Sequence, residues 1–159
     1  MQEPIIRRAE ERDIPRVGEL LLQVNEVHHR IRPDLFKTGA RKYRDDELRA
    51  IFADPATPVF VREDAGTVVG YAFCIVQKHE NDNNLVDGKT LYLDDLCVDE
   101  GARGRGIGAS LYRFVLDYAK KSGCHNVTLN VWEGNDAALA FYRKCGLSVQ
   151  KYGMEQVLR

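Results

Sequence analysis

A glycine-rich segment between an apolar strand and an amphipathic helix constrains this chain more than any other feature. Arg103-Gly104-Arg105-Gly106-Ile107-Gly108 follows the apolar run Thr90–Val98 and precedes a stretch whose apolar residues recur with a helical period. Backbone N–H groups at a helix start lack intrahelical partners, and the helix dipole adds positive potential there. Glycines let a ligand come close, and the arginines add charge. The segment therefore predicts a phosphate or pyrophosphate site.

This segment could be one of two known phosphate-binding loops or a turn with no ligand. A P-loop needs lysine followed by Ser or Thr, and Gly108-Ala109-Ser110 has no lysine, which excludes ordinary ATP or GTP hydrolysis. Gly104, Gly106 and Ala109 satisfy the dinucleotide pattern G-x-G-x-x-A, and Glu133 ends the next expected strand. Only about 50 residues follow, too few for the remaining βαβ units of that fold. The structural interpretation is a tight turn with solvated arginines.

Hydrophobic periodicity and turn residues predict an α+β fold, with a mixed, mostly antiparallel central sheet of about seven strands flanked by about four helices. The three-residue turn Asp64-Ala65-Gly66 should close an antiparallel hairpin, and the apolar run Val68–Val76 indicates a strand near the middle of the sheet. Strands are expected at Pro4–Arg8, Pro58–Glu63, Thr67–Gln77, Thr90–Val98, Asn126–Trp132, Leu147–Tyr152 and Met154–Leu158. Helices are expected from Asp13, as the capping residue, through Val24, at Asp45–Phe52, from Ile107 to near Gly123, and at Asn135–Cys145.

Length and composition are typical of a water-soluble globular protein and exclude several functions. The 159 residues predict one domain, 1–159, with 44% apolar and 30% charged residues. A net charge of -1 provides no basic field for nucleic acid. No apolar run reaches the roughly 18 residues that span a bilayer, and the N-terminus lacks the apolar centre of a signal peptide. We therefore expect a cytoplasmic protein that binds neither nucleic acid nor membrane.

Neither cysteine nor histidine spacing predicts a metal or redox site. The four cysteines are too far apart in the sequence for a CxxC pair, and we expect them to be reduced. His28 and His29 lie near an expected helix end, with no Cys or acidic ligand at a metal spacing. We therefore expect no metal and no catalytic cysteine.

Three motifs in this chain together resemble the Gcn5-related N-acetyltransferase (GNAT) superfamily. That family carries Q/R-x-x-G-x-G/A after its fourth strand, and Arg103, Gly106 and Gly108 match it. The preceding LDDLCV is also similar to the family, and N-x-x-A-x-x-F-Y-x-x-x-G is matched by Asn135, Ala138, Phe141, Tyr142 and Gly146. The motifs occur in family order between Leu91 and Leu147, and the expected element order resembles the family fold over nearly the whole chain.

This resemblance implies an enzyme that transfers the acetyl group of acetyl-CoA to an amine by direct attack in a ternary complex. Backbone amides near Leu96, Cys97 and Val98 would bind pantetheine and polarise the thioester carbonyl, with Asn135 close by. Tyr142 matches the tyrosine that commonly protonates the departing thiolate, although its apolar helical stripe is also typical of core packing. The pyrophosphate would be held by Arg103, Gly104, Arg105, Gly106, Ile107, Gly108 and Ala109.

The general base and the acceptor are less constrained. An amine is mostly protonated at neutral pH, so a carboxylate should accept its proton, and Asp94 and Asp95 are the candidates. Because successive strand residues point to opposite faces, we expect only one of them to face the acceptor. Polyamine acetyltransferases of the superfamily have glutamate at the position of Asp94, and enzymes that acetylate a ribosomal-protein N-terminus have glutamate where this chain has Asn130. A small amine, a lysine side chain and a protein N-terminus all stay open as acceptors, as do other acyl groups.

Two further hypotheses concern partners. The acceptor is expected over residues 28–43, between the first two helices, where the sequence identifies no ligand. A non-catalytic acyl-CoA sensor is the alternative to an enzyme, and it would need the glycine turn but neither Tyr142 nor a base. The two last expected strands, around Gly153, could present an edge to a second copy, so a homodimer stays open.

Overall fold

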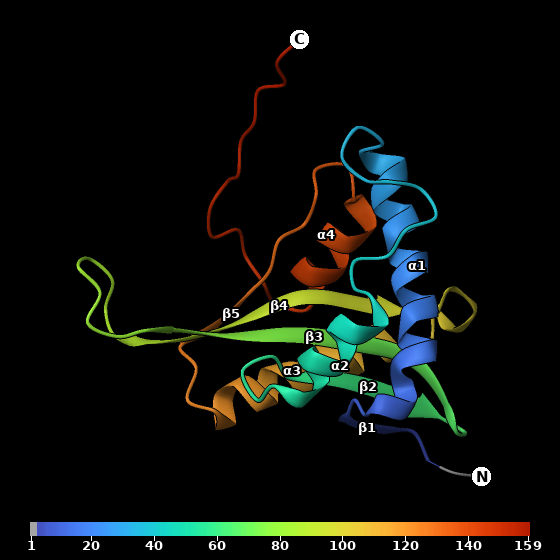
Figure 1. Cartoon of the computed structure of the whole chain (residues 1–159). Helices are drawn as coiled ribbons and strands as arrows, with labels where there is room; N and C mark the ends of the chain where they lie inside the picture. Colours follow the sequence, from blue (N-terminus) through green and yellow to red (C-terminus); the bar gives the residue numbers. More distant parts are fainter. Residues whose placement is uncertain (1–2) are drawn as a thin grey trace.

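A computed structural model describes residues 3–159 and shows an α+β fold built on one twisted sheet (Figure 1). The strands follow the order β1-β2-β3-β4-β5, and all neighbours pair antiparallel except β4 and β5, which are parallel. The strands are β1 (Ile5–Arg8), β2 (Val59–Asp64), β3 (Thr67–His79), β4 (Gly88–Val98) and β5 (Asn126–Thr128), and the helices are α1 (Ile14–Ile31), α2 (Asp45–Ala53), α3 (Ile107–Lys121) and α4 (Asp136–Lys144).

Each face of the sheet is covered by helices. α1 and α2 pack on the face that carries Tyr71 and Phe73, and α3 packs on the opposite face around Leu91 and Leu111. The central position of β3 confirms the prediction from its unbroken apolar run, because both faces of that strand are buried. Gly70 lets α3 approach the sheet, since a Cβ there would lie 3.0 Å from the Leu111 side chain of this helix.

The sheet has five strands in the described residues, not about seven. β5 ends at Thr128 and not at Trp132, and the expected strands Leu147–Tyr152 and Met154–Leu158 do not form. The residues from Ser148 onward instead run away from the sheet as an extended segment (Figure 1). A strand needs a neighbour to satisfy its backbone groups, and within residues 3–159 no strand pairs with this segment.

Two local expectations are also corrected. Asp64 pairs with Thr67, so the β2–β3 turn has two central residues, Ala65 and Gly66, both with positive φ. Asp13 is the residue before α1, as expected, but its carboxylate does not cap the helix. It accepts hydrogen bonds from Arg7 at 2.8 and 2.9 Å and from the Glu10 backbone N–H at 2.8 Å. No helix within residues 3–159 is long and apolar enough to cross a bilayer.

Candidate active site

The two parallel strands β4 and β5, which precede the glycine motif and follow α3, separate after three residue pairs. β4 pairs with β5 only from Thr90 to Tyr92, and Asn130 donates a side-chain hydrogen bond to the Tyr92 hydroxyl at 3.1 Å where the strands part. The rest of β4, from Leu93 to Val98, has no strand on that side. Its backbone groups there are available to a ligand, and this stretch includes Leu96, Cys97 and Val98.

A β-bulge interrupts the pairing of β4 with β3 at the two predicted acids. Asp95 lies opposite Phe73 and Leu93 lies opposite Cys74, so Asp94 is the extra residue of the bulge. A bulge breaks the strict alternation of side chains along a strand. Both acids therefore bond to groups around Phe73 on the α1–α2 face, so the expectation that their side chains point to opposite faces of the sheet is wrong. Which of the two faces the acceptor stays a prediction.

Asp94 is held by two side chains of the segment between α1 and α2. The Lys42 ammonium lies 2.9 Å from Oδ1, and the Tyr43 hydroxyl donates to Oδ2 at 2.7 Å. Tyr43 stacks on Phe73 with ring centroids 5.5 Å apart, which fixes this segment against the sheet. The Asp94 side chain is only 11% exposed, whereas that of Lys42 is 48% exposed. Asp94 is therefore a nearly buried carboxylate that already binds a primary ammonium group at the molecular surface.

Asp95 has a different environment from its neighbour. Its carboxylate accepts a hydrogen bond from the Tyr71 hydroxyl at 2.7 Å, and no cation pairs with it among the described residues. Burial raises the pKa of Asp95 to about 6, against the lowering effect of the Tyr71 hydrogen bond. Burial also raises the pKa of the Cys97 thiol to about 12, so this thiol keeps its proton and is a poor nucleophile at neutral pH.

The glycine turn has the geometry of an anion site. Gly104 and Gly106 have φ values of 82° and 73°, and open space surrounds the positions where their Cβ atoms would lie. Gly106 precedes α3 without a side-chain cap, so the first amides of this helix keep their donors for a ligand. Arg103 and Arg105 each donate from Nε to a nearby carbonyl, of Val98 at 3.4 Å and of Ala102 at 3.3 Å, which anchors both guanidinium groups beside the turn.

Gly108 differs from the other two glycines of the motif. A Cβ at Gly108 would lie 3.2 Å from the Phe141 ring, so this glycine permits close packing of α3 against α4. The α1 helix also positions the turn, because Gln23 bonds both the Asp99 carboxylate at 2.9 Å and the Glu100 N–H at 3.1 Å. The backbone between β4 and α3 is therefore fixed from both sides.

Helix α4 carries the last predicted residues. Asn135 accepts a hydrogen bond from the Ala138 N–H at 3.3 Å, so its side chain caps α4. Tyr142 packs against the core around α3, with its ring centroid 5.0 Å from that of Phe141. Burial, and after it the negative charge of Asp95, raises the pKa of Tyr142 well above its ordinary value. The phenol therefore keeps its proton throughout the neutral range.

Sequence reasoning missed the partners of both acids. Lys42, Tyr43 and Tyr71 contact Asp94 or Asp95, and the first two lie in the segment where no ligand group could be identified. Lys42 and Asp94 are separated by 52 residues, and nothing in the local pattern of either relates the two. Within residues 3–159, no three His, Cys, Asp or Glu side chains form a possible metal site, and the absence of a metal stays a prediction.

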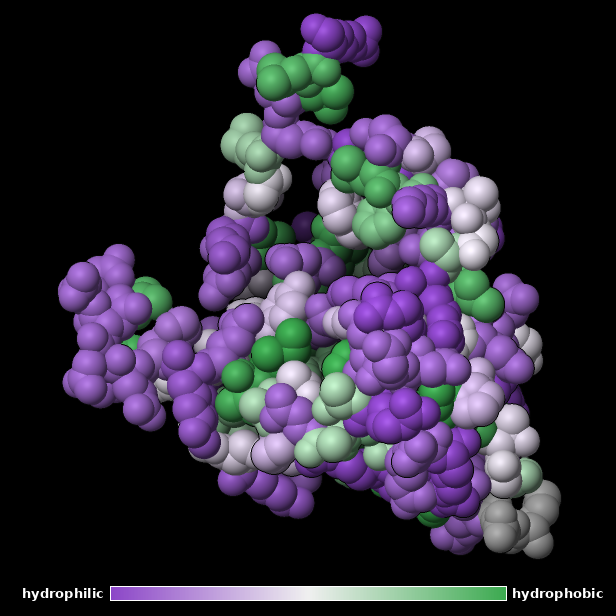
Figure 2. Space-filling model, in the orientation of Figure 1, coloured by the Kyte–Doolittle hydropathy of each residue, from purple (hydrophilic) through white to green (hydrophobic). Residues whose placement is uncertain are grey.

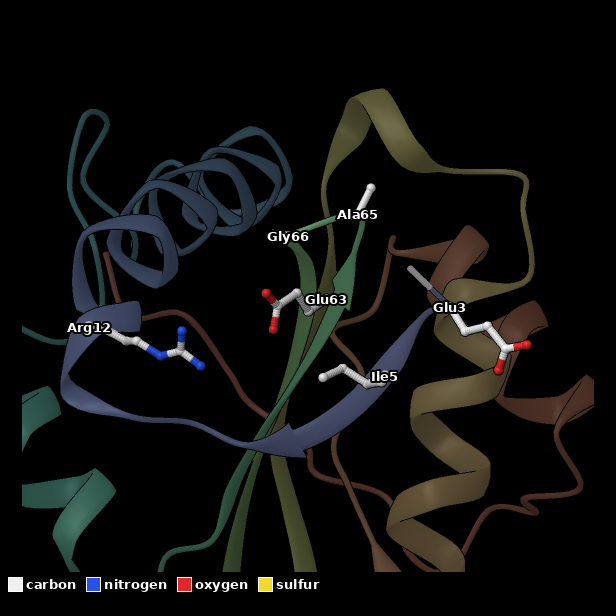
Figure 3. Close-up of a pocket in the computed structure, with 6 residues that line it drawn as sticks. All are labelled: Glu3, Ile5, Arg12, Glu63, Ala65 and Gly66. Atoms are coloured by element: carbon white, nitrogen blue, oxygen red, sulfur yellow. The ribbon is translucent and has the colours of Figure 1, made fainter. Parts of the chain in front are cut away.

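A surface hollow elsewhere in the molecule contains none of the predicted site residues. It lies at the β1 end of the sheet, beside the tip of the β2–β3 hairpin, and Figure 3 shows the Glu3 carboxylate pointing away from Glu63 and Arg12. None of its residues belongs to the predicted site, and β5 lies at the opposite end of the strand order. The lining residues are Glu3, Ile5, Arg12, Glu63, Ala65 and Gly66.

Comparison with known proteins identifies relatives of this chain. A family model described as "Acetyltransferase (GNAT) family" matches residues 22–147. A glucosamine 6-phosphate N-acetyltransferase from Trypanosoma brucei brucei is 27% identical over 149 residues, which cover 94% of this chain and 92% of that protein. One from Arabidopsis thaliana is 28% identical over 113 residues, 71% of this chain and 72% of that protein.

Solved structures share the fold over nearly the full chain. A crystal structure of a mutant of the BH1408 protein from Bacillus halodurans has a TM-score of 0.93 at 31% identity, with 98% of this chain and 99% of that chain covered. A crystal structure of glucosamine-6-phosphate N-acetyltransferase from Arabidopsis thaliana has a TM-score of 0.70 at 25% identity, with 99% of this chain and 100% of that chain covered.

Proposed function

Because the chain belongs to the GNAT acetyltransferase family, we propose that it transfers the acetyl group of acetyl-CoA to the primary amine of a small molecule. The observation that carries this proposal is the Lys42–Asp94 ion pair, since it places an amine on a nearly buried carboxylate beside the stretch of β4 that lacks a strand neighbour. An acceptor amine entering there would meet the same carboxylate.

The donor end of the site fits coenzyme A. The two positive-φ glycines leave open space at the start of α3, and the uncapped amides together with Arg103 and Arg105 suit a diphosphate. The unpaired edge of β4 at Leu96, Cys97 and Val98 offers backbone donors and acceptors for the amides of pantetheine. Bound acetyl-CoA would supply an acetyl group already activated as a thioester, so the protein needs no nucleophile of its own.

We assign the two proton transfers to Asp94 of β4 and Tyr142 of α4. Asp94 holds the acceptor ammonium in place of Lys42 and takes its proton, which leaves a neutral amine that can attack. Tyr142 keeps its phenolic proton at neutral pH because burial raises its pKa, and it is the donor we assign to the leaving sulfur. Asp95 accepts a hydrogen bond from Tyr71 and pairs with no cation among the described residues, so we do not assign it to the acceptor amine.

An anionic amino sugar is the acceptor class that the site favours. Residues 30–44, which carry Lys42 and Tyr43 to Asp94, contain six basic residues and one acidic residue. This charge would attract a phosphorylated amine and repel a polycation such as a polyamine. The relatives named as glucosamine 6-phosphate N-acetyltransferases support the same class. No contact in the structure favours the alternative, an acyl-CoA sensor without catalysis.

An amine panel tests the acceptor and the reaction together. Purified protein and acetyl-CoA are mixed with glucosamine 6-phosphate, glucosamine, spermidine, an aminoglycoside and a peptide with a free N-terminus, and release of free thiol is followed. We expect the highest kcat/KM for the phosphorylated amino sugar. A preference for spermidine over the sugar phosphate would reject the acceptor class, and no acetylation of any amine would reject the enzyme.

Tyr142→Phe separates an enzyme from a sensor. Loss of the phenolic proton should lower kcat by about 10²-fold or more while the affinity for acetyl-CoA changes little, because the ring still packs. Tyr118→Phe is the matched control, since Tyr118 packs on Phe60 of β2. An unchanged kcat in Tyr142→Phe would exclude Tyr142 as the acid.

A further inference from the structure

Two aromatic side chains from distant segments meet near the candidate site. Phe36 lies between α1 and α2, and Trp132 lies between β5 and α4. We call these two residues the aromatic pair. Their ring centroids are 5.4 Å apart at an interplanar angle of 89°, which is an edge-to-face contact. Figure 1 shows the segment after β5 rising toward the end of α1 before α4 begins. The pair therefore joins the segment that contacts Asp94 to the segment that follows β5.

The Phe36 side of the aromatic pair is held on α1. The His28 ring packs on the Phe36 ring with centroids 5.1 Å apart. His29 donates from Nδ1 to the Phe36 carbonyl at 2.6 Å, and Asn25 donates to the Lys37 carbonyl at 2.7 Å. The pair is thus positioned without a ligand, so a ligand that packs on it pays little for ordering these side chains.

The surface beside the aromatic pair is apolar and lies near the proposed amine position. Trp132 is 40% exposed, and Leu35 of the α1–α2 segment is 52% exposed. Figure 2 shows hydrophobic surface at the end of α1, where this segment begins. Burial, and after it the positive charge of Lys42, lowers the pKa of His28, so its ring is neutral at neutral pH. Lys42 thus acts on His28 while it binds Asp94, and an uncharged aromatic surface adjoins the ion pair.

We propose that the aromatic pair is the wall of the acceptor site that packs against the ring of an amino sugar. This inference rests on the proposed function, because it takes Asp94 as the group that binds the amine. A pyranose has faces of C–H groups and polar edges, so an aromatic surface suits its face while charged groups bind its amine and phosphate. A linear amine of the same charge has no such face. Phe36 and Trp132 would therefore select cyclic over linear acceptors.

Two ligands that differ in the ring test this selection. Glucosamine 6-phosphate and O-phosphoethanolamine both carry an amine and a phosphate, but only the first has a sugar ring. Isothermal titration calorimetry measures the binding of each to the full chain saturated with CoA, which allows no turnover. In the wild type, the dissociation constant of O-phosphoethanolamine should be at least about tenfold higher. Trp132→Ala should abolish this difference, and the conservative variant Trp132→Phe should keep most of it.

The fluorescence of Trp132 locates the ring independently of any variant. Trp132 is the single tryptophan of the chain, so its emission reports on this place alone. Saturating glucosamine 6-phosphate should change the emission more than saturating O-phosphoethanolamine does. Phe36→Leu keeps this reporter and should lower the ratio of the two dissociation constants by about threefold. The affinity for CoA and the melting temperature should stay unchanged in each variant.

Several results would overturn the proposal. They are equal binding of both ligands by the wild type, no binding of the sugar, wild-type affinity for the sugar in Trp132→Ala, and an equal loss of CoA affinity in that variant. Failure of the proposed function would look different. Acetylation of the sugar phosphate with an unchanged KM in Trp132→Ala would reject the aromatic pair alone, whereas ring-dependent binding without acetylation would reject the enzyme alone.

Discussion

In the proposed mechanism Lys42 and the acceptor amine compete for Asp94, so the loss of Lys42 should change the KM for the acceptor in a definite direction. Lys42→Met removes the competing ammonium while Tyr43 still holds the segment against Asp94. An ion pair as exposed as this one contributes little, so the KM for the acceptor amine should fall by about two- to fivefold with kcat unchanged. Initial rates over a range of acceptor concentrations measure both parameters.

Asp94→Asn should have the opposite effect. An amide cannot take a proton from the amine, and we expect kcat/KM to fall by about 10²-fold or more. Lys120→Met is the control for Lys42→Met, because it removes an exposed lysine of α3. If Lys42→Met lowered kcat/KM as Asp94→Asn does, Lys42 would be needed to position Asp94. The hypothesis that Lys42 competes with the acceptor would then be wrong.

The raised pKa of Asp95 makes the stability of the protein depend on pH. An unfolded aspartate has a pKa of about 3.9, whereas burial raises that of Asp95 to about 6 in the folded chain. Between these values the folded state binds a proton that the unfolded state does not. Stability therefore falls as the pH rises through this window, by up to about 1.4 kcal/mol per pH unit for this one group.

The variant Asp95→Asn isolates this contribution. Its side-chain carbonyl can still accept the Tyr71 hydrogen bond but does not titrate. The free energy of unfolding of the wild type, measured by urea denaturation and referred to that of the variant, should decline from pH 4 to about pH 6 and then level off. A difference that stays flat across this range would show that Asp95 is ionised throughout.

Sequence reasoning singled out two candidate acids but did not predict how they are arranged. Asp94 and Asp95 could be singled out because a carboxylate next to the glycine motif suits an amine substrate. The expected alternation failed because a bulge depends on how β3 and β4 register, and no residue type signals it there. Lys42 and Tyr43 reach Asp94 through the packing of Tyr43 on Phe73, a tertiary contact without a local pattern.

At the level of elements, a variant in the turn before α3 can distinguish a loss of affinity for acetyl-CoA from a loss of stability. Gly106→Ala places a Cβ in the open space beside the first amides of α3 and forces a side chain into the left-handed region. The strain costs about 1–2 kcal/mol of stability, and we expect the KM for acetyl-CoA to rise by about tenfold through weakened hydrogen bonds.

Gly66→Ala is the matched control for this strain. Gly66 has a φ of 82°, and its Cβ would also lie in open space, but it is in the β2–β3 turn. The two variants should lose similar stability in thermal unfolding, and only Gly106→Ala should change the KM for acetyl-CoA. If both variants had the same KM for acetyl-CoA, the proposal that this turn binds the diphosphate would be wrong.

Elements with local signals were predicted well, and those that depend on distant partners were not. The four expected helices all form, and each has an apolar stripe. Two of them, α3 and α4, end near a glycine, whereas α1 continues to Ile31, beyond the last expected apolar position at Val24. β5 is shorter than its apolar run because β4 diverges from it after Tyr92. Residues 147–158 have a strand-like sequence but no partner strand, which a pattern along one chain cannot reveal.

For the whole molecule, the proposed site joins residues of several elements. β4 would contribute its open edge and Asp94, α3 the amides of its first turn, α4 Tyr142, and the segment after α1 the basic side chains. The sheet and the two buried clusters hold these elements together. A ligand that spans several of them should therefore stabilise the fold as a whole, because it binds the folded state alone.

Coenzyme A should raise the melting temperature more than pantetheine does. Saturation at about 100 times the dissociation constant adds about 2.7 kcal/mol, which corresponds to roughly 5–10 °C for a chain of this length. Pantetheine lacks the diphosphate and would contact only the edge of β4, so its shift at equal concentration should be smaller. Differential scanning fluorimetry with both compounds measures the difference, and Gly106→Ala should reduce the shift with coenzyme A toward that with pantetheine. Equal shifts in the wild type would mean that the β4–α3 turn holds no diphosphate.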